Sequence, residues 1–532
     1  MNKLPHGIQS FSKIIEGGYV YADKTQYVYN LLNDASYYFL SRPRRFGKSL
    51  LIDTIAEAFS GNKELFKGLF IYDSDYSFEK HPVLRLDMSN IVNESSEKLK
   101  DSLSKALLRY VKKEGLDIPF DMPSEMFKTL IEELYNKYNK KVVVLVDEYD
   151  KPILDQLNRI EIAEANRDVL RSFYGVLKSM DPFLRMTFIT GITKFTKTTI
   201  FSGLNNLLDI TLSKKYANIC GIEIDDLRKY FNEHIEYLST LDDFDIYDDI
   251  YNEILYWYDG YSWDGKTRVL NPFSLLSFFI EEKFSSFWYS SGTPKFLVDI
   301  IKKDPSIYTS LKNLKMTELM LDITEIDDIE AQLLLFQTGY LTVKEIMPAK
   351  GSNIYVLDMP NFEVRDAFNL HMVAAFTGKK QPYVKQAQLE MDEALVESDL
   401  QKVLELLRQL FASIPYQLHI DKEAYYHSIF FAVMNVLGFE IDVEVSVSSG
   451  RVDAILELDD KVYIIEFKYN ECPSDATVED KNRIFEKSLE NGMKQINDKG
   501  YAKRYFGCGK EIIQAAFAFL GRDDIAMRSE RC

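Results

Sequence analysis

A glycine, a lysine and a serine stand together at Gly47, Lys48 and Ser49, in the stretch SRPRRFGKSLL. A phosphate-binding loop needs backbone N–H groups facing the phosphates, a lysine for the β- and γ-phosphates, and a hydroxyl for Mg²⁺ at a helix start. The stretch YYFLS before the loop is typical of a strand, and SLLIDTIAEAF after it is typical of an amphipathic helix. This context predicts a nucleotide site of the Walker A kind, with Ser49 as a Mg²⁺ ligand and with these binding residues: Arg44, Arg45, Phe46, Gly47, Lys48, Ser49 and Leu50.

The loop departs from the common pattern at its first position. In G-x-x-x-x-G-K-[ST] the first glycine falls at Arg42, whose side chain must be kept out of the tight turn. Pro43 stiffens the loop, and Arg44 and Arg45 add positive charge that a triphosphate could use. The loop is therefore degenerate, yet it keeps the residues that hold phosphates.

Two carboxylates follow another apolar run about a hundred residues on. The stretch KVVVLVDEYDKP is typical of a buried strand with Asp147 and Glu148 at its C-terminal end, where open α/β sheets bind ligands. We expect Asp147 to hold Mg²⁺, as in a Walker B strand, and Glu148 to polarise the attacking water. The alternative is a core strand that ends in solvated carboxylates, and the upstream Lys48 and Ser49 favour the nucleotide site.

A further strand candidate, RMTFITG, leads to Thr190 and Thr193. A polar residue at this strand end could sense the γ-phosphate, so both threonines are candidate sensors. The alternative is that threonine stands here only because of its β-propensity.

A second constellation lies near the C-terminus, in GRVDAILELDDKVYIIEFKYN, which contains Asp453, Glu466 and Lys468. A two-residue hairpin loop at Asp459-Asp460 would pair Asp453 with Glu466, with Cβ atoms roughly 5 Å apart, and would put Lys468 on the same face. Paired carboxylates can hold a divalent cation, and the lysine can orient or deprotonate a water. This is the chemistry of a metal-dependent nuclease; the alternative is an exposed hairpin with ordinary acidic residues.

The stretch DKEAYYHSIFFAVMNVLGFE, just upstream, is typical of a helix. Glu423 and His427 are four residues apart and share one face of it. We expect Glu423 to add a carboxylate to the metal, whereas a satisfied, partly buried histidine is the alternative for His427.

Residues 481–510 form a basic segment, with eight Lys and Arg against three Asp and Glu, a net charge of +5. Lys494, Gln495 and Tyr501 lie there and are expected to contact the nucleic-acid backbone. The alternative is a solvated helix face.

The composition limits the class of protein. The chain has 532 residues, a net charge of −18, 46% apolar and 27% charged residues, and four cysteines without CxxC spacing. This length predicts about three domains, and the cysteines favour neither a disulfide framework nor a zinc site. The N-terminus lacks the pattern of a signal peptide and no window approaches a membrane span, so we expect a cytoplasmic protein without membrane contact. The overall acidity does not suit a protein that coats nucleic acid over its whole surface.

Taken together, these stretches resemble a bacterial family with an N-terminal AAA-ATPase-like domain and a C-terminal PD-(D/E)xK nuclease-superfamily domain. The resemblance covers nearly the whole chain and rests on YADKT, RPRRFGKSLL, VLVDEYDKP, FITGITKF, IFSGLNNLLDITL, YDGYSW, NPFSLL, YYHSIFF, GRVDAILE and IIEFK. The family loop also begins with arginine, so Arg42 is not a private defect of this chain. The resemblance implies nucleotide and Mg²⁺ roles for Lys48, Ser49, Asp147 and Glu148, and a nuclease core of Asp453, Glu466 and Lys468.

The predicted fold is α/β in several parts. An AAA-ATPase-like P-loop domain with a parallel sheet covers residues 1–221, with strands at 37–41, 83–88, 141–147 and 185–191. A helical lid region follows at 222–376 and ends in a helix and hairpin, as in a winged helix. Residues 377–400 are a linker and helical start, and residues 401–532 form an α/β domain like that of restriction endonucleases.

The expected function is that of an ATPase whose nucleotide state controls a metal-dependent nuclease acting on DNA or RNA, with DNA favoured. The cofactors would be ATP and Mg²⁺, with Mn²⁺ as an alternative at the nuclease site. A homo-oligomer and a protein partner that delivers the nucleic acid stay open. One alternative is an NTPase switch or scaffold with an inactive nuclease fold as a binding module. Another is nucleotide binding without turnover, against which Glu148 counts.

Overall fold

The structure of the chain is a computed structural model. It describes residues 1–532 except 195–199, 202–203, 205, 242–243, 245–246, 289–297, 299, 303–305, 323–329, 413–429, 431, 437–439, 444–451, 473–475 and 522–523. The chain forms two compact units, the first of Met1–Phe296 and Leu311–Val364 and the second of Leu297–Ser310 and Arg365–Cys532. The first unit therefore joins the predicted P-loop domain to most of the predicted helical region.

The first unit is built on a five-stranded sheet with the strand order β2-β3-β4-β1-β5. All its strand pairs are parallel. Every residue of β1 and β3 is buried, as expected for strands covered on both faces. The four predicted strands are confirmed, and a short fifth strand joins them: β1 (Tyr37–Ser41), β2 (Val83–Asp87), β3 (Val142–Asp147), β4 (Leu184–Gly191) and β5 (Leu208–Asp209).

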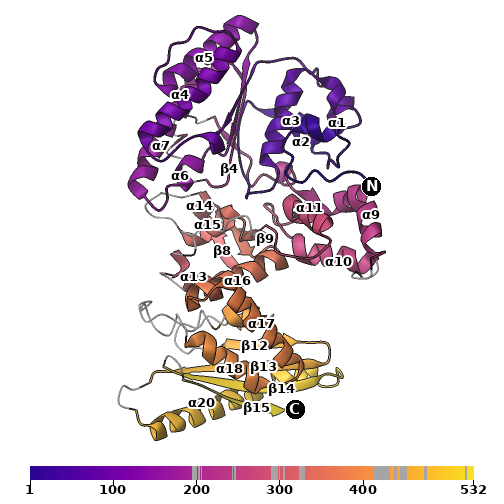
Figure 1. Cartoon of the computed structure of the whole chain (residues 1–532), viewed down its shortest axis with the longest axis vertical. Coiled ribbons are helices and arrows are strands. Elements are labelled where there is room, and N and C mark those ends of the chain that lie inside the picture. The colour runs from indigo at the N-terminus through magenta and orange to yellow at the C-terminus, as the bar shows by residue number, and fades with distance from the viewer. Residues whose placement is uncertain are drawn as a thin grey trace. The chain divides into compact units, whose positions relative to one another are not determined.

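Helices lie on both faces of this sheet, with α1 to α3 on one side and α4, α5 and α7 on the other (Figure 1). Their ends follow local signals: the Ser95 side chain caps α4 by accepting from the backbone N–H of Lys98, and α3 ends at Gly61, whose φ is +83°. The helices are α1 (Phe11–Glu16), α2 (Thr25–Asp34), α3 (Lys48–Ser60), α4 (Ser96–Lys113), α5 (Pro123–Tyr138), α6 (Lys151–Leu154) and α7 (Ile160–Ser179).

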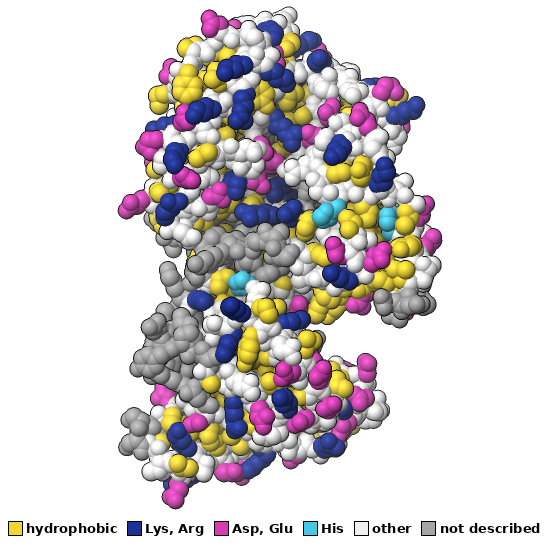
Figure 2. All heavy atoms as spheres, in the orientation of Figure 1, with side chains coloured by type: hydrophobic (Ala, Val, Ile, Leu, Met, Phe, Trp, Pro, Cys, Tyr) yellow, Lys and Arg dark blue, Asp and Glu magenta, His cyan; other side chains and the backbone are white. Residues whose placement is uncertain are grey.

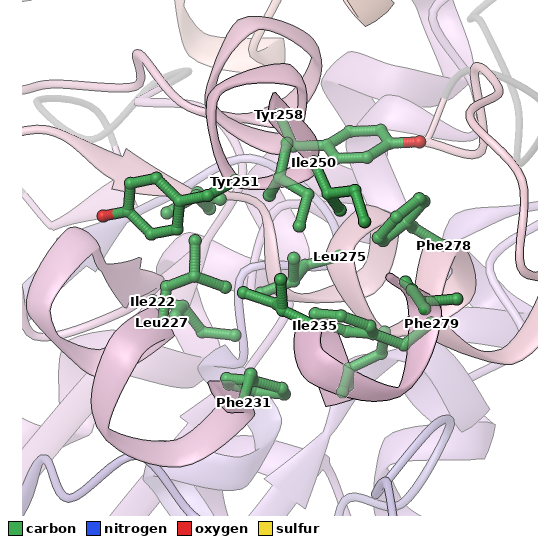
Figure 3. Packing of buried hydrophobic residues seen from close by; sticks show 14 of the residues in the cluster. Ile222, Leu227, Phe231, Ile235, Ile250, Tyr251, Tyr258, Leu275, Phe278 and Phe279 are labelled. Carbon is green, nitrogen blue, oxygen red and sulfur yellow. The ribbon is translucent and has the colours of Figure 1, made fainter. Parts of the chain in front are cut away.

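Three more helices pack around an aromatic core, and we call them the lid: α9 (Ile224–Leu238), α10 (Tyr247–Tyr258) and α11 (Pro272–Glu281). Figure 3 shows this core, in which Phe231 of α9 stacks on Phe279 of α11 with ring centroids 5.4 Å apart. The short pair β6 (Ile222–Glu223) and β7 (Val269–Leu270) brings together the segments that lead into α9 and α11. Val20 belongs to the same core, so the N-terminal segment is packed into the lid.

The predicted helix and hairpin before residue 376 are present. Helix α15 (Ala331–Thr338) ends at Gly339 and leads into the hairpin of β9 (Thr342–Ala349) and β10 (Ser352–Asp358). Strand β8 (Leu314–Thr317) pairs with the other side of β10, and α14 (Glu318–Asp322) follows it. Helix α16 (Phe362–Thr377) begins in the first unit and continues into the second.

Glu363, near the start of α16, is a fully buried carboxylic acid. Its Oε1 accepts hydrogen bonds from the backbone N–H of Trp288, at 2.6 Å, and from Ser274 Oγ, at 3.0 Å. Burial raises the pKa of Glu363 to about 7, although these donors oppose the shift. Glu363 is therefore largely protonated in the folded protein at mildly acidic pH, whereas it would be ionised in the unfolded chain.

We predict that Glu363 makes the stability of the first unit fall as pH rises. Because the folded pKa lies above the unfolded value, the stabilisation is complete below about pH 4.5 and is lost as pH rises through about 7, for a total of roughly 3 kcal/mol. Urea unfolding, followed by tryptophan fluorescence at pH 5 and pH 8, measures the change, since all three tryptophans lie in the first unit. Glu363→Gln should remove this part of the pH dependence, and an equal pH dependence in both proteins would contradict the assignment.

The second unit contains a five-stranded mixed sheet with the order β11-β12-β13-β14-β15. Its strands are β11 (Glu440–Val443), β12 (Val452–Glu457), β13 (Lys461–Asn470), β14 (Glu511–Leu520) and β15 (Asp524–Arg531). The register pairs Asp453 with Glu466, which confirms the predicted hairpin. The helices of this unit are α13 (Ser306–Thr309), α17 (Gln381–Val396), α18 (Leu400–Phe411) and α20 (Val478–Lys499).

The predicted linker and helical start at 377–400 differ from the structure in the linker part, because α17 begins already at Gln381. Pro382 misled the prediction, because proline in the first turn of a helix removes no intrahelical hydrogen bond. Among the described residues, no helix is long and apolar enough to cross a membrane.

Candidate functional sites

The predicted phosphate loop lies between the end of β1 and the start of α3. Gly47 takes the left-handed conformation, with φ +92°, and Lys48 is the first residue of α3. A Cβ at Gly47 would meet nothing within 4 Å, so glycine is favoured here by its backbone conformation, and the space beside the loop is open. The helix N-terminus therefore presents its N–H groups at a place that a phosphate can approach.

Lys48 is buried, with 6% of its surface exposed. Its Nζ donates to the carbonyl oxygens of Arg42, at 2.8 Å, and Pro43, at 2.9 Å. Burial lowers the pKa of Lys48, while the nearby Asp147 and Glu148 oppose the shift. The ammonium is thus held by two neutral carbonyl groups of its own loop.

Arg42, at the position of the missing glycine, points away from the loop. Its guanidinium donates to the carbonyls of Ser41, Thr211 and Tyr216 at 2.8–3.2 Å and lies 3.9 Å from the centre of the Trp263 ring. The side chain is fully buried, and burial lowers the pKa of Arg42 to about 10, so it stays charged at neutral pH. Arg42 therefore ties the loop to the chain around β5 and to the segment after the lid helix α10.

We predict that Arg42→Gly, which restores the common loop pattern, destabilises the protein and does not improve nucleotide binding. The carbonyls of Thr211 and Tyr216 would each lose one hydrogen bond and a cavity would open beside Trp263, at a cost on the order of 2–4 kcal/mol. Urea unfolding measured by tryptophan fluorescence tests the cost. Arg42→Lys keeps the charge without the planar guanidinium, so its free energy of unfolding should lie between those of the wild type and Arg42→Gly. A glycine variant as stable as the wild type would contradict this role.

Asp147 and Glu148 lie at the C-terminal end of β3, with β4 between β3 and the loop strand β1. Thr190 Oγ1, at the end of β4, donates to Asp147 Oδ1 at 2.8 Å. Glu148 has a left-handed backbone, with φ +53°, and burial raises its pKa. A carboxylate whose pKa is raised is better suited to accept a proton from water.

The two candidate sensors have different surroundings. Thr190 touches Asp147, so it lies beside the acidic end of β3. The backbone N–H of Thr193, at 2.6 Å, and its hydroxyl, at 2.7 Å, both donate to Asp150 Oδ2. Thr193 therefore holds the buried Asp150 in place, and Thr190 is the more suitable of the two for a sensor.

A cavity of about 470 Å³ joins the loop to Glu148. Its wall includes all seven predicted nucleotide-binding residues of the loop, from Arg44 to Leu50. The rest of the wall includes residues 5–9 and 20–22 and residues of the lid such as Phe231 and Phe273. Sequence reasoning missed this part of the wall, although YADKT, which contains Tyr21, Ala22 and the wall residue Lys24, was among the motifs of the resemblance. The cavity has a charged end for phosphates and an apolar wall for a base.

In the second unit, Glu466 and Lys468 lie on one face of β13. Glu466 is 1% exposed, and Lys468 Nζ lies 2.9 Å from its Oε1. Asp453 pairs with Glu466 across the hairpin in the backbone register, and its side chain lies outside the described part of the structure. Lys468 thus gives the buried carboxylate of Glu466 a positively charged partner.

Gln495, which is predicted to contact nucleic acid, lies against this pair. Its Oε1 accepts a hydrogen bond from Lys468 Nζ, and its buried Nε2 has no hydrogen-bond partner among the described residues. Helix α20 can come this close because of Gly492, where a Cβ would lie 2.8 Å from Ala516 Cβ. Lys494 is exposed on the same helix, and Tyr501 begins a 3₁₀ turn after it.

The predicted metal site of the second unit extends beyond the described residues. Glu423 and His427 lie outside them, as does the Asp453 side chain. Within the residues that the structure describes, there is no group of three or more His, Cys, Asp or Glu placed to hold a metal ion. The ligand set of Asp453, Glu466 and Glu423 therefore stays a prediction.

Comparison with known proteins identifies two domains in the chain. Residues 5–201 match the family described as predicted AAA-ATPase, and residues 421–528 match the PD-(D/E)XK nuclease superfamily. An uncharacterized protein from the vnfD 5′ region of Azotobacter chroococcum mcd 1 is 35% identical over 517 residues, which cover 96% of this chain and 95% of that protein. The chain belongs to the AAA-ATPase-like family with a PD-(D/E)XK nuclease-superfamily domain.

A solved structure also aligns with this AAA-ATPase-like protein. The structure of the Aeropyrum pernix ORC2 protein, in ADPNP and ADP complexes, is 11% identical, covers 65% of this chain and 93% of its own, and has a TM-score of 0.26. A likeness this low carries no argument about function.

Proposed function

We propose that the first unit binds and hydrolyses ATP and that its nucleotide state controls a metal-dependent nuclease in the second unit. The observation that carries the first half is the cavity into which the loop residues Lys48 and Ser49 and the carboxylate Glu148 all open. The second half rests on the buried Glu466. Its carboxylate forms an ion pair with Lys468, and its backbone lies opposite Asp453 in the hairpin.

In the nucleotide site, Lys48 and the N–H groups at the start of α3 would hold the β- and γ-phosphates. Ser49 and Asp147 would hold Mg²⁺, which, when bound, offsets the negative charge of the phosphates. Glu148, whose pKa is raised by burial, would accept a proton from the attacking water. Thr190 would keep Asp147 in place through its hydrogen bond.

In the nuclease site, Asp453, Glu466 and Glu423 would hold Mg²⁺ or Mn²⁺, which supplies Lewis-acid activation of the phosphodiester when bound. Lys468 would orient the attacking water or stabilise the charge that develops on the phosphate. Gln495 would keep the ammonium of Lys468 in position. Lys494 and Tyr501 remain proposed contacts for the nucleic-acid backbone.

The proposed substrate is nucleic acid, DNA ahead of RNA, bound through local contacts. In Figure 2, Lys and Arg side chains are interspersed with Asp and Glu side chains over the face in view. The net charge of the chain is −18. A local basic surface would then be needed to hold the backbone. We further propose that the protein is cytoplasmic. The proposal also allows a homo-oligomer and a partner protein that delivers the nucleic acid.

The test is cleavage of DNA and of RNA by the full chain, with Mg²⁺ or Mn²⁺, in the presence of ATP, a non-hydrolysable analogue, or no nucleotide. Metal-dependent cleavage whose rate changes with ATP supports the proposal. ATP hydrolysis without cleavage under any of these conditions would contradict the nuclease half. That result would favour the alternative, an NTPase switch with a nuclease-fold binding module.

A further inference from the structure

Trp288 connects the phosphate loop to the beginning of α16. Its indole Nε1 donates to the carbonyl of Arg44 in the loop at 3.2 Å, and its backbone N–H donates to Glu363 Oε1 at 2.6 Å. The residue is 6% exposed, and its ring meets that of Tyr340 edge-on at 5.2 Å. Trp288 thus forms hydrogen bonds to two segments of the first unit that lie far apart in sequence, one through its side chain and one through its backbone.

The ring of Trp288 also forms part of a close contact on the outer side of the loop. At Gly339, a Cβ would lie 2.7 Å from Pro43 Cβ and 3.2 Å from Trp288 Cζ2. Gly339 has φ +96°, so both its conformation and its surroundings exclude other residues. The loop is therefore packed against this contact on one side and open to the cavity on the other.

At the other end of the connection, Glu363 is held on several sides. Ser274 of lid helix α11 donates to its Oε1, and Ser286 Oγ donates to its carbonyl oxygen at 3.3 Å. Its Oε2 has no hydrogen-bond partner among the described residues. The chain passes into the second unit two residues later, at Arg365, within the same helix α16.

We propose that Trp288 is a positioning residue that fixes the phosphate loop and transmits its nucleotide-dependent movement to Glu363 and the start of α16. This inference rests on the proposed nucleotide binding at the loop. Phosphates would draw Lys48 away from the carbonyls of Arg42 and Pro43, and the neighbouring carbonyl of Arg44 is the one that Trp288 holds. A shift of this loop must then move Trp288 or break its indole hydrogen bond.

The test uses Trp288→Phe in the full chain, with Tyr138→Phe as the control. Both changes remove one side-chain hydrogen bond, because the exposed Tyr138 hydroxyl, at the end of α5, donates to Glu114 Oε2 at 2.6 Å. Calorimetry gives the Kd of ATP with Mg²⁺, and hydrogen exchange of peptides from residues 362–377 gives the response of α16. We expect Trp288→Phe to weaken ATP binding about fivefold, as the loss of one hydrogen bond implies, and to abolish the ATP-induced change in exchange at α16.

A second pair of variants tests the same connection from its other end and does not alter the loop. Glu363→Ala removes the acceptor of the Trp288 N–H and should abolish the response of α16 to ATP, whereas Glu363→Gln keeps an acceptor oxygen and should restore it. If Trp288→Phe and Glu363→Ala both behave like Tyr138→Phe, the inference is wrong. If the wild type itself binds no ATP in the calorimeter, the proposed nucleotide site fails and the inference fails with it.

Discussion

Lys48→Ala is expected to lower kcat/KM for ATP hydrolysis by at least about a hundredfold, the cost of removing one charge-stabilising group aimed at a developing phosphate charge. Lys48 is suited to this role because its buried ammonium is held by two loop carbonyls, with Asp147 and Glu148 close enough to affect its pKa. A steady-state phosphate-release assay measures the effect. Direct titration with a fluorescent ATP analogue would show how much of the decrease in kcat/KM comes from weaker ATP binding.

Lys178→Ala is the matched control, because Lys178 is an exposed lysine near the end of α7. It should hydrolyse ATP as the wild type does. Equal hydrolysis by the wild type and Lys48→Ala would mean that the turnover does not occur at this loop. Binding by both proteins without hydrolysis by either would instead favour a nucleotide site without turnover.

Lys468→Ala is expected to lower the rate of nucleic-acid cleavage by about 10²–10³-fold, the usual cost of removing one group that stabilises charge in the transition state. The change also leaves the buried Glu466 without its 2.9 Å partner and leaves Gln495 Oε1 without its donor. Cleavage of labelled DNA and RNA with Mg²⁺ or Mn²⁺, at saturating substrate, measures the rate.

Lys402→Ala, on the exposed side of α18, provides the control for this second prediction. Binding of a labelled oligonucleotide in EDTA should be nearly equal in the two variants, because the role assigned to Lys468 is in the chemical step. Cleavage by Lys468→Ala at the wild-type rate would remove Lys468 from the site.

Much of the fold followed from short-range patterns in the sequence. The strands that end at Ser41 and Asp147 are continuous apolar runs, and the pairing of Asp453 with Glu466 followed from a two-residue turn. Such features depend on neighbouring residues, which a sequence displays directly. The family resemblance then added the roles of residues in both sites.

Other features depend on packing between distant segments. Gln495 lies 27 residues from Lys468, and their hydrogen bond exists because the small Gly492 lets α20 approach the sheet. The side-chain direction of Arg42 is set by carbonyls of residues 211 and 216, and no local pattern indicates them. The lid was predicted as a separate region because its aromatic segments do not reveal that Val20 packs among them.

The ATP dependence of cleavage tests the coupling of the two units most directly. The rate of nucleic-acid cleavage is measured for the wild type and for Lys48→Ala, each with and without ATP, at one concentration of Mg²⁺ or Mn²⁺. Coupling predicts that ATP changes the rate of the wild type and leaves the rate of Lys48→Ala unchanged. A wild-type protein that hydrolyses ATP and cleaves at the same rate with and without it would contradict control of the nuclease by the nucleotide.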